Sequence, residues 1–184
     1  EVGNVSVSAT GVVRIGRNDA SASGNITVSA AINSSGTTIL HLITGAAVAD
    51  GNATGNDITE TSLAIESVSG IGSGTTLETA VTNLAFNNTT SNAVTISNSG
   101  ALTIASVDGV PTSSNGGTTT TITATSPITF AVNTSSVGTA TYTSDDDNLA
   151  GNDDNITVNA GVTVEVTGAA SDLIFQSGDR IIIN

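Results

Sequence analysis

The stretch AVTISNSGALTIASVDG, residues 93–109, decides the fold. In its segments 93–97 and 101–105, apolar residues alternate with Thr, Ser or Asn, and a short turn of Ser, Asn and Gly separates the two. Alternation over about four to eight residues is the pattern of a half-buried strand, and Gly, Ser and Asn end strands at turns. The stretch therefore predicts two short β-strands joined by a turn.

The same plan recurs along the chain. Further alternating segments cover residues 5–9, 25–29, 121–124, 155–159 and 162–166. If these strand units are equivalent, they start at unequal intervals, at Ile26, Ile58, Val94, Ile122 and Ile156. A strand unit repeated at irregular spacing fits a β-solenoid with variable loops, and it also fits a β-sandwich with several hairpins.

Composition supports β-structure throughout residues 1–184. Thr, Ser, Asn and Gly make up 92 of the 184 residues, and the β-branched Thr, Val and Ile make up 66. Branched side chains pack well on a pleated surface. We predict an all-β fold in one domain or one segment of a longer repeat array, a parallel β-solenoid first and an antiparallel β-sandwich or jelly roll second. At roughly 20 to 25 residues per coil, a solenoid of this length has about seven to nine coils.

One segment is ambiguous. Residues 75–86, TTLETAVTNLAF, place apolar side chains at helix spacing and open with the capping pattern Thr75-x-x-Glu78. The alternative is a strand over residues 81–86. The segment therefore predicts either a short helix or a strand.

Charge excludes several classes of partner. The formal net charge is −13, with 16 acidic residues, three Arg and no Lys. Phosphate binding needs Lys or Arg to replace counterions, so we expect neither nucleic acid nor an anionic membrane surface as partner. No apolar run reaches the roughly 18 residues that span a bilayer, so membrane insertion is not expected either.

Missing residue types argue against catalysis. The chain has no Cys and no Lys, which removes thiol, disulfide and Schiff-base chemistry. Alternation places its one His, His41, on the same face of a strand as Ile39 and Ile43, and no nucleophile-elbow motif accompanies it. We predict that the protein is not an enzyme, that His41 has a structural role, and that no organic cofactor is bound.

The strongest local feature is an acidic stretch near residue 150. Ca²⁺ takes six to eight oxygen ligands, which Asp and Asn on a loop containing Gly can supply. A weaker version comprises Asp50, Asn52, Asn56 and Asp57. The alternative is a solvated loop that uses Asp and Asn for turns. The predicted calcium ligands are Asp145, Asp146, Asp147, Asn152, Asp153 and Asp154.

Residues 72–109, 124–168 and 177–183 resemble a known class of protein. Their texture is similar to the β-strand repeats of giant secreted bacterial surface proteins, the filamentous-haemagglutinin-like and autotransporter-type adhesins. The resemblance covers most of the chain from about residue 49. It implies a right-handed parallel β-helix, an extracellular or cell-surface location, and a role in adhesion or surface structure, with no catalytic residues to carry over.

Assembly is the expected basis of function. Residues 181–183 are three consecutive Ile, an apolar strand without a polar cap, so we expect flanking repeats of a parent chain or other copies to pair there. The first prediction is a non-catalytic structural or adhesive module of a surface fibre, filament or surface layer. The alternatives are a calcium- or glycan-binding adhesin domain that contacts a host or glycan surface, and a sandwich-type filament subunit that donates residues 1–9 as a strand.

Two Thr-rich segments raise one more possibility. Residues 118–125 and 139–143 resemble the flat Thr ranks of ice-binding solenoids. Such ranks need Thr-x-Thr at a regular coil period, and the sequence shows no such period.

Overall fold

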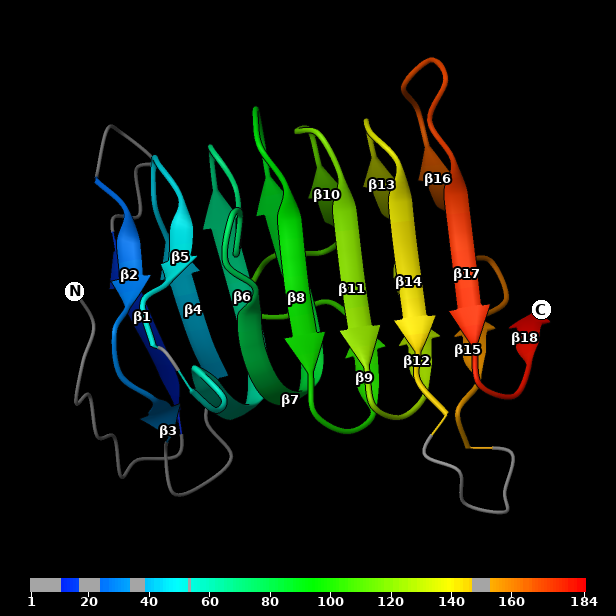
Figure 1. Ribbon diagram of the computed structural model, residues 1–184, viewed down its shortest axis with the longest axis horizontal. Helices are drawn as coiled ribbons and strands as arrows, with labels where there is room; N and C mark the ends of the chain where they lie inside the picture. The colour runs from blue at the N-terminus through cyan, green and yellow to red at the C-terminus, as the bar shows by residue number, and fades with distance from the viewer. Residues whose placement is uncertain (1–10, 17–23, 34–38, 53, 147–152) are drawn as a thin grey trace.

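The computed structural model describes residues 11–16, 24–33, 39–52, 54–146 and 153–184. Over these residues it contains 18 strands and no helix, and hence no helix able to cross a membrane. The strands coil around one axis and pair in parallel with strands one coil earlier and one coil later (Figure 1). The β-solenoid is confirmed. The sandwich or jelly roll is wrong because every pair of named strands is parallel.

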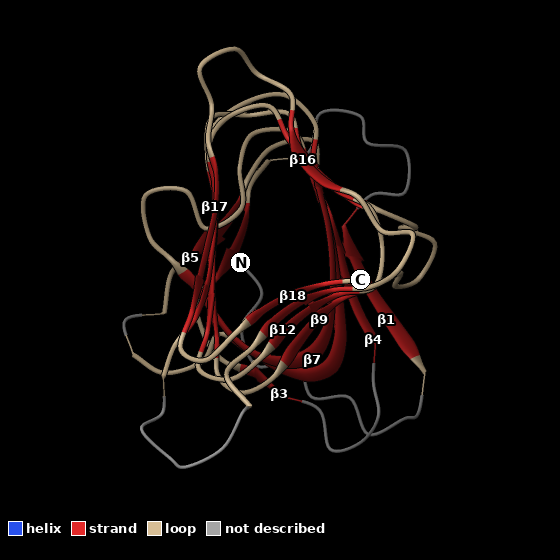
Figure 2. Ribbon diagram, turned by 90° about the vertical axis from the view of Figure 1, so that its right-hand side faces the viewer, coloured by secondary structure: helices blue, strands red, loops and turns tan. Residues whose placement is uncertain are grey.

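Three parallel sheets form the sides of a roughly triangular cross-section (Figure 2). Face A contains β2 (Ile26–Val28), β5 (Val48–Asp50), β8 (Val94–Asn98), β11 (Thr120–Ala124), β14 (Ala140–Ser144) and β17 (Leu173–Ser177). Face B contains β3 (Ile32–Asn33), β9 (Leu102–Ile104), β12 (Ile128–Phe130), β15 (Ile156–Val158) and β18 (Ile181–Ile183). Face C contains β1 (Val12–Gly16), β4 (Ile39–Ile43), β10 (Ser113–Asn115), β13 (Thr134–Ser136) and β16 (Val164–Val166). Two long strands turn corners: β6 (Ile58–Ser67) bends from face B into face C, and β7 (Leu77–Asn88) begins beside β8 of face A, passes β9 of face B and ends beside β10 of face C.

The coil is right-handed, as expected. In Figure 1 the face A strands run downward at the front, the chain passes beneath to the back, and it rises there before crossing to the next front strand on the right. A chain that turns in this sense while advancing to the right describes a right-handed superhelix.

Coil length varies because loops of different length leave the corners. Seven paired positions align along face A and bound six turns of unequal length: Ile26, Val48, Ile71, Val94, Thr120, Ala140 and Leu173. The prediction of seven to nine coils was therefore too high. The assumed starts were also wrong, since Ile58 and Ile156 lie on face B and the other three lie on face A.

The ambiguous segment is a strand, so the helix prediction was wrong. In β7 the buried positions 77, 79 and 81 shift to 84, 86 and 88 where the strand bends between faces. This phase shift produced the three-residue spacing that imitates a helix. Ala85 points outward but is buried, because Val107 and Val110 of the β9–β10 loop pack over it.

The interior is apolar along the faces and polar at its corners. Phe130, Tyr142 and Phe175 pack together with ring centroids 4.9 to 5.9 Å apart. At the corner between faces C and A, Asn88 Nδ2 donates to Asn115 Oδ1 at 2.8 Å, and Asn115 Nδ2 donates to Thr120 Oγ1 at 3.0 Å. This polar ladder runs inside the coil rather than on its outer surface.

Candidate functional site

Both acidic segments of the sequence leave the solenoid at the corner between faces A and B. Residues 51–57 connect β5 to β6, and residues 145–155 connect β14 to β15. In each case the following coil adds a third carboxylate, Glu78 to the first group and Asp179 to the second. The common position explains why two distant segments share a run of Asp, Asn and Gly.

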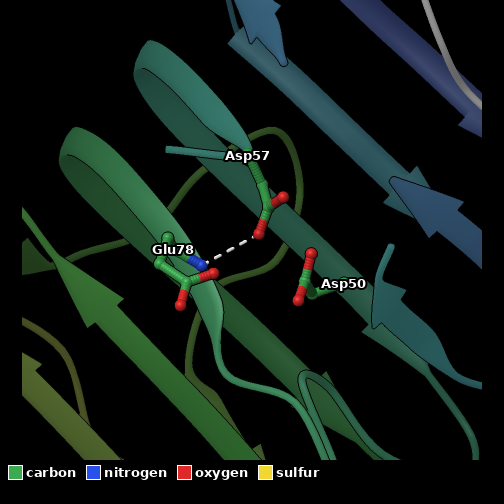
Figure 3. A group of neighbouring side chains, drawn as sticks. All are labelled: Asp50, Asp57 and Glu78. Atoms are coloured by element: carbon green, nitrogen blue, oxygen red, sulfur yellow. Dashed lines mark hydrogen bonds between the residues drawn. The ribbon is translucent and has the colours of Figure 1, made fainter. Parts of the chain in front are cut away.

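The first group consists of Asp50, Asp57 and Glu78. Asp50 ends β5, Asp57 immediately precedes β6, and Glu78 is the second residue of β7. One oxygen from each carboxylate lies within 4.8 Å of the others (Figure 3). Three acidic side chains are thus held together by parallel strands of successive coils.

Asp57 is the buried member of this group. It has no exposed surface, and its Oδ2 accepts the main-chain N–H of Glu78 at 3.0 Å (Figure 3). Its Oδ1 is buried and has no hydrogen-bond partner among the described residues. Burial raises the pKa of Asp57 to about 7. The Glu78 N–H opposes this rise, whereas the negative charges of Asp50 and Glu78 and a side-chain hydrogen bond with Asp50 add to it.

A pocket of about 210 Å³ adjoins the group. Its lining consists of Asp50, Asn52, Thr54, Gly55 and Glu78. Asp50 Oδ1 accepts the main-chain N–H of Asn52 at 2.6 Å, which folds the β5–β6 loop over this corner. The pocket therefore brings further side-chain oxygens of the loop beside Asp50 and Glu78, the two carboxylates that line it.

The second group consists of Asp153, Asp154 and Asp179. The main-chain N–H of Asp154 donates to Asp179 Oδ2 at 3.1 Å, and Ser177 Oγ donates to the carbonyl of Asp154 at 2.6 Å. Two of the six predicted calcium ligands, Asp153 and Asp154, thus lie together. Of the other four, Asp145 and Asp146 are exposed and outside the group, and Asp147 and Asn152 lie outside the described residues.

Of the two acidic sets predicted from the sequence, the weaker one near residue 50 is the better organised. In it, Glu78 takes the place expected for Asn56. Asp50 and Asp57 meet as the spacing suggested, and Asn52 lines the adjoining pocket. Asn56 instead accepts a hydrogen bond from Ser99 Oγ at 3.3 Å. Sequence reasoning missed Glu78 because it was assigned to a helix cap. A search one coil onward from Asp57 would have found it.

The buried His41 lies on the outside of face C, in a hydrogen-bond network with Asp108 and with the more exposed side chains of Arg14 and Glu66. Its Nδ1 is 2.8 Å from Asp108 Oδ2 and its Nε2 is 3.1 Å from Glu66 Oε1. Arg14 Nε donates to Asp108 Oδ2 at 2.8 Å. Burial alone would raise the pKa of Asp108, but hydrogen bonds and charge from Arg14 and His41 outweigh it and lower that pKa. These contacts fasten the β9–β10 loop across β1 and β4.

The outer surface of face A carries a threonine array. Parallel pairing places Thr121 and Thr123 of β11 beside Thr141 and Thr143 of β14. On the other side, β8 contributes Thr95 and Ser97 in the same register. Thr-x-Thr is therefore repeated in two neighbouring coils, with Thr95 and Ser97 of β8 on one side and Ile174 and Gln176 of β17 on the other.

A hydroxyl-rich hollow lies on face C. It has a volume of about 320 Å³ and contains no aromatic side chain in its lining, which consists of Thr112, Ser113, Asn133, Thr134, Ser135, Thr163 and Glu165. Sugar sites commonly use aromatic platforms, so this hollow is weak support for a glycan site.

Comparisons with protein-family models, with curated proteins and with solved structures found no match to this chain. The similarity to adhesin repeats remains a prediction from sequence texture. Functional conclusions therefore depend on the solenoid and its surfaces.

Proposed function

We propose that the chain is a non-catalytic structural module of an extracellular fibre, filament or surface layer, with an adhesive role. The observation that carries the proposal is the parallel stacking of successive coils along all three faces, which on face A between β5 and β8 is maintained by isolated bridges at Ile71. In a solenoid each coil contacts only its neighbours, so length and surface can be extended without changing the core. The acidic charge and the lack of Lys are compatible with an exposed, soluble surface.

The last coil presents the surface on which such a module would be extended. Ile181 and Ile183 of β18 are 49% and 72% exposed. Val164, Val166, Leu173 and Phe175 are only partly buried there. Open strand edges with apolar side chains promote pairing with another chain. The proposed partners are therefore flanking repeats of a parent chain or other copies of this chain.

Sedimentation and electron microscopy test the proposal. At rising concentration the chain is expected to form continuous thin rods that lengthen by stacking of coils. Ile183→Lys places a charge on the exposed edge of β18 and is expected to shorten the rods. Val137→Lys is the matched control, because Val137 is 46% exposed on a side loop rather than at the open end. A chain that remains strictly monomeric at high concentration would contradict the proposal.

The threonine array favours a second candidate function, binding to ice. Strands about 4.8 Å apart with outward residues about 6.7 Å apart along each strand form a flat, regular grid of methyl and hydroxyl groups. Thermal hysteresis that falls with Thr121→Tyr on face A, and persists with Ser135→Tyr on face C, would support this function. Absence of hysteresis at millimolar protein would refute it.

The remaining alternatives have less structural support. Donor-strand polymerisation was argued from a sandwich, and the parallel solenoid removes that basis. The proposed donor, residues 1–9, lies outside the described residues. Contact with a host or glycan surface keeps the hollow on face C as its candidate location.

A further inference from the structure

We propose that Asp50, Asp57 and Glu78 bind one calcium ion, which links β5, β6 and β7. The site is separate from the acidic stretch near residue 150, and the inference does not depend on the adhesive or structural role proposed above. It rests on three observations: the approach of the carboxylates, the unpartnered oxygen of Asp57, and the adjoining pocket.

The spacing of the carboxylates matches a hard cation. Ca²⁺ lies about 2.3–2.6 Å from its oxygen ligands, so two ligands on opposite sides of the ion are at most about 5 Å apart. The three carboxylate oxygens lie within 4.8 Å of one another. The group is therefore compact enough for a single ion to contact all three side chains.

Asp57 Oδ1 receives no hydrogen bond from a described donor, and Asp57 can hydrogen-bond to Asp50 only by sharing a proton, so a cation is the alternative partner for both carboxylates. Buried polar atoms in proteins are almost always hydrogen-bonded, and each exception needs an explanation. Asp57 Oδ1 is buried without a hydrogen-bond partner among the described residues, while Oδ2 is held in place by the Glu78 N–H. A cation would satisfy Oδ1 and relieve the repulsion from Asp50 and Glu78 together.

No basic side chain among the described residues is placed to neutralise the group. The sequence has no Lys, and Arg14 pairs with Asp108 on face C. His41 is engaged by Asp108 and Glu66, and Arg180 adjoins the second acidic group in the last coil. Within the described part of the chain, neutralisation of the three adjacent carboxylates is therefore left to protons or to a bound cation.

The chemistry of the donors selects calcium. All the candidate ligands are oxygens, whereas zinc prefers Cys and His. The pocket lined by Asn52 and Thr54 offers room for water and further oxygen ligands, as the six to eight ligands of Ca²⁺ require. Mg²⁺ demands a stricter octahedral arrangement and gives up its water reluctantly, so it suits this irregular corner less well.

The experiment measures melting temperature and heat of binding on the chain after treatment with EGTA. We expect one calcium ion per chain and, at 100 times the dissociation constant, a rise in melting temperature of about 5 °C or more. Sodium chloride at matched ionic strength is the first control, because screening of the net charge of −13 could by itself raise stability.

Two variants locate the ion. Asp57→Asn can still accept the Glu78 N–H but loses its charge, and Glu78→Gln changes a half-buried side chain that the fold tolerates more readily. Each is expected to weaken calcium binding at least tenfold. The matched control is Asp153→Asn with Asp179→Asn, which alters the second acidic group and is expected to leave the measured affinity unchanged.

Three outcomes would overturn the proposal. One is the absence of a calcium-dependent rise in melting temperature up to 10 mM calcium, which is far above about 1 mM, the weak end of the affinity range of calcium sites. Another is an equal rise with sodium chloride alone. The last is a calcium effect that survives Glu78→Gln and disappears in the Asp153 and Asp179 control.

Discussion

Replacement of Asn88 by Ala is expected to destabilise the solenoid more than any neighbouring surface substitution. Asn88 is fully buried at the corner between faces C and A. Its Oδ1 accepts from Gly70 N at 2.8 Å and Ser67 Oγ at 3.2 Å, and its Nδ2 donates to Ser91 O at 2.9 Å and Asn115 Oδ1 at 2.8 Å. Alanine removes all four bonds without removing any of their partners.

The magnitude follows from which partners stay buried. Gly70 and Ser67 are buried and would lose an acceptor, and each buried donor without a partner costs about 1–3 kcal/mol. Ser91 is partly exposed and can turn to water, and Asn115 Oδ1 keeps its bond from Gly117 N at 2.8 Å. Together with the lost packing, the free energy of unfolding should fall by about 3–5 kcal/mol.

Asn87→Ala is the matched control. Asn87 is the preceding residue, points outward, and accepts one hydrogen bond, from Ser114 Oγ at 2.8 Å. Solvent can replace that bond, so we expect a loss of about 1 kcal/mol or less. Urea unfolding followed by circular dichroism measures both variants. If Asn88→Ala lowers stability by no more than Asn87→Ala does, the buried ladder does not hold this corner and the reasoning fails.

Three further predictions concern Asp57, Asp108 and Gly138. Burial raises the pKa of Asp57 to about 7, so the folded state binds this proton more tightly than the unfolded state does. In EGTA, the free energy of unfolding should therefore fall by roughly 2 kcal/mol from pH 4 to pH 7, a value reduced for solvent near the group. Urea titrations at each pH should show a flatter pH dependence for Asp57→Asn. The pKa of Asp108 is lowered, so its charged form stabilises the folded state above the acid range. Asp108→Asn should therefore lower the free energy of unfolding by about 1 kcal/mol at pH 7 and by little at pH 3. An equal loss at both pH values would contradict a role for the charge of Asp108. A Cβ on Gly138 would lie 1.3 Å from the carbonyl oxygen of Thr118, so Gly138→Ala should lower the melting temperature by several degrees, whereas Gly24→Ala meets nothing within 4 Å and should be neutral.

Alternation along the faces could be predicted because it depends only on local sequence. In β8, β9, β11 and β15 each buried residue is flanked by exposed or half-exposed ones, as the sequence pattern indicated. Such strands are short and lie on one face, so period two holds from end to end.

The register between coils could not be predicted, because it depends on the number of residues in the loop at each corner. Among the face A positions, the shortest coil runs from Thr120 to Ala140 and the longest runs from Ala140 to Leu173. A longer loop at a corner increases the number of residues between two stacked strands but does not change which strands pair. Because the loop lengths vary, the sequence alone did not show that the Thr residues of β11 and β14 lie side by side, or that Asp57 lies next to Glu78.

The corners, rather than the faces, are where this sequence departs from alternation, and the physical reason is main-chain pairing. Along a face every strand satisfies its N–H and C=O groups with the coils on either side, but at a bend some of these groups turn inward and need side-chain partners. Asn88 supplies them at the corner between faces C and A, and Asn98 does so between faces A and B, where its Oδ1 accepts from Val81 N at 2.9 Å and its Nδ2 donates to Val81 O at 3.1 Å. Asp57 fills the same structural role toward Glu78 N, yet a carboxylate, unlike an amide, also brings a charge that the bend does not need. A neutral Asn would have served the main chain alone, so the carboxylate of Asp57 beside Asp50 and Glu78 is the feature that the proposed calcium ion accounts for.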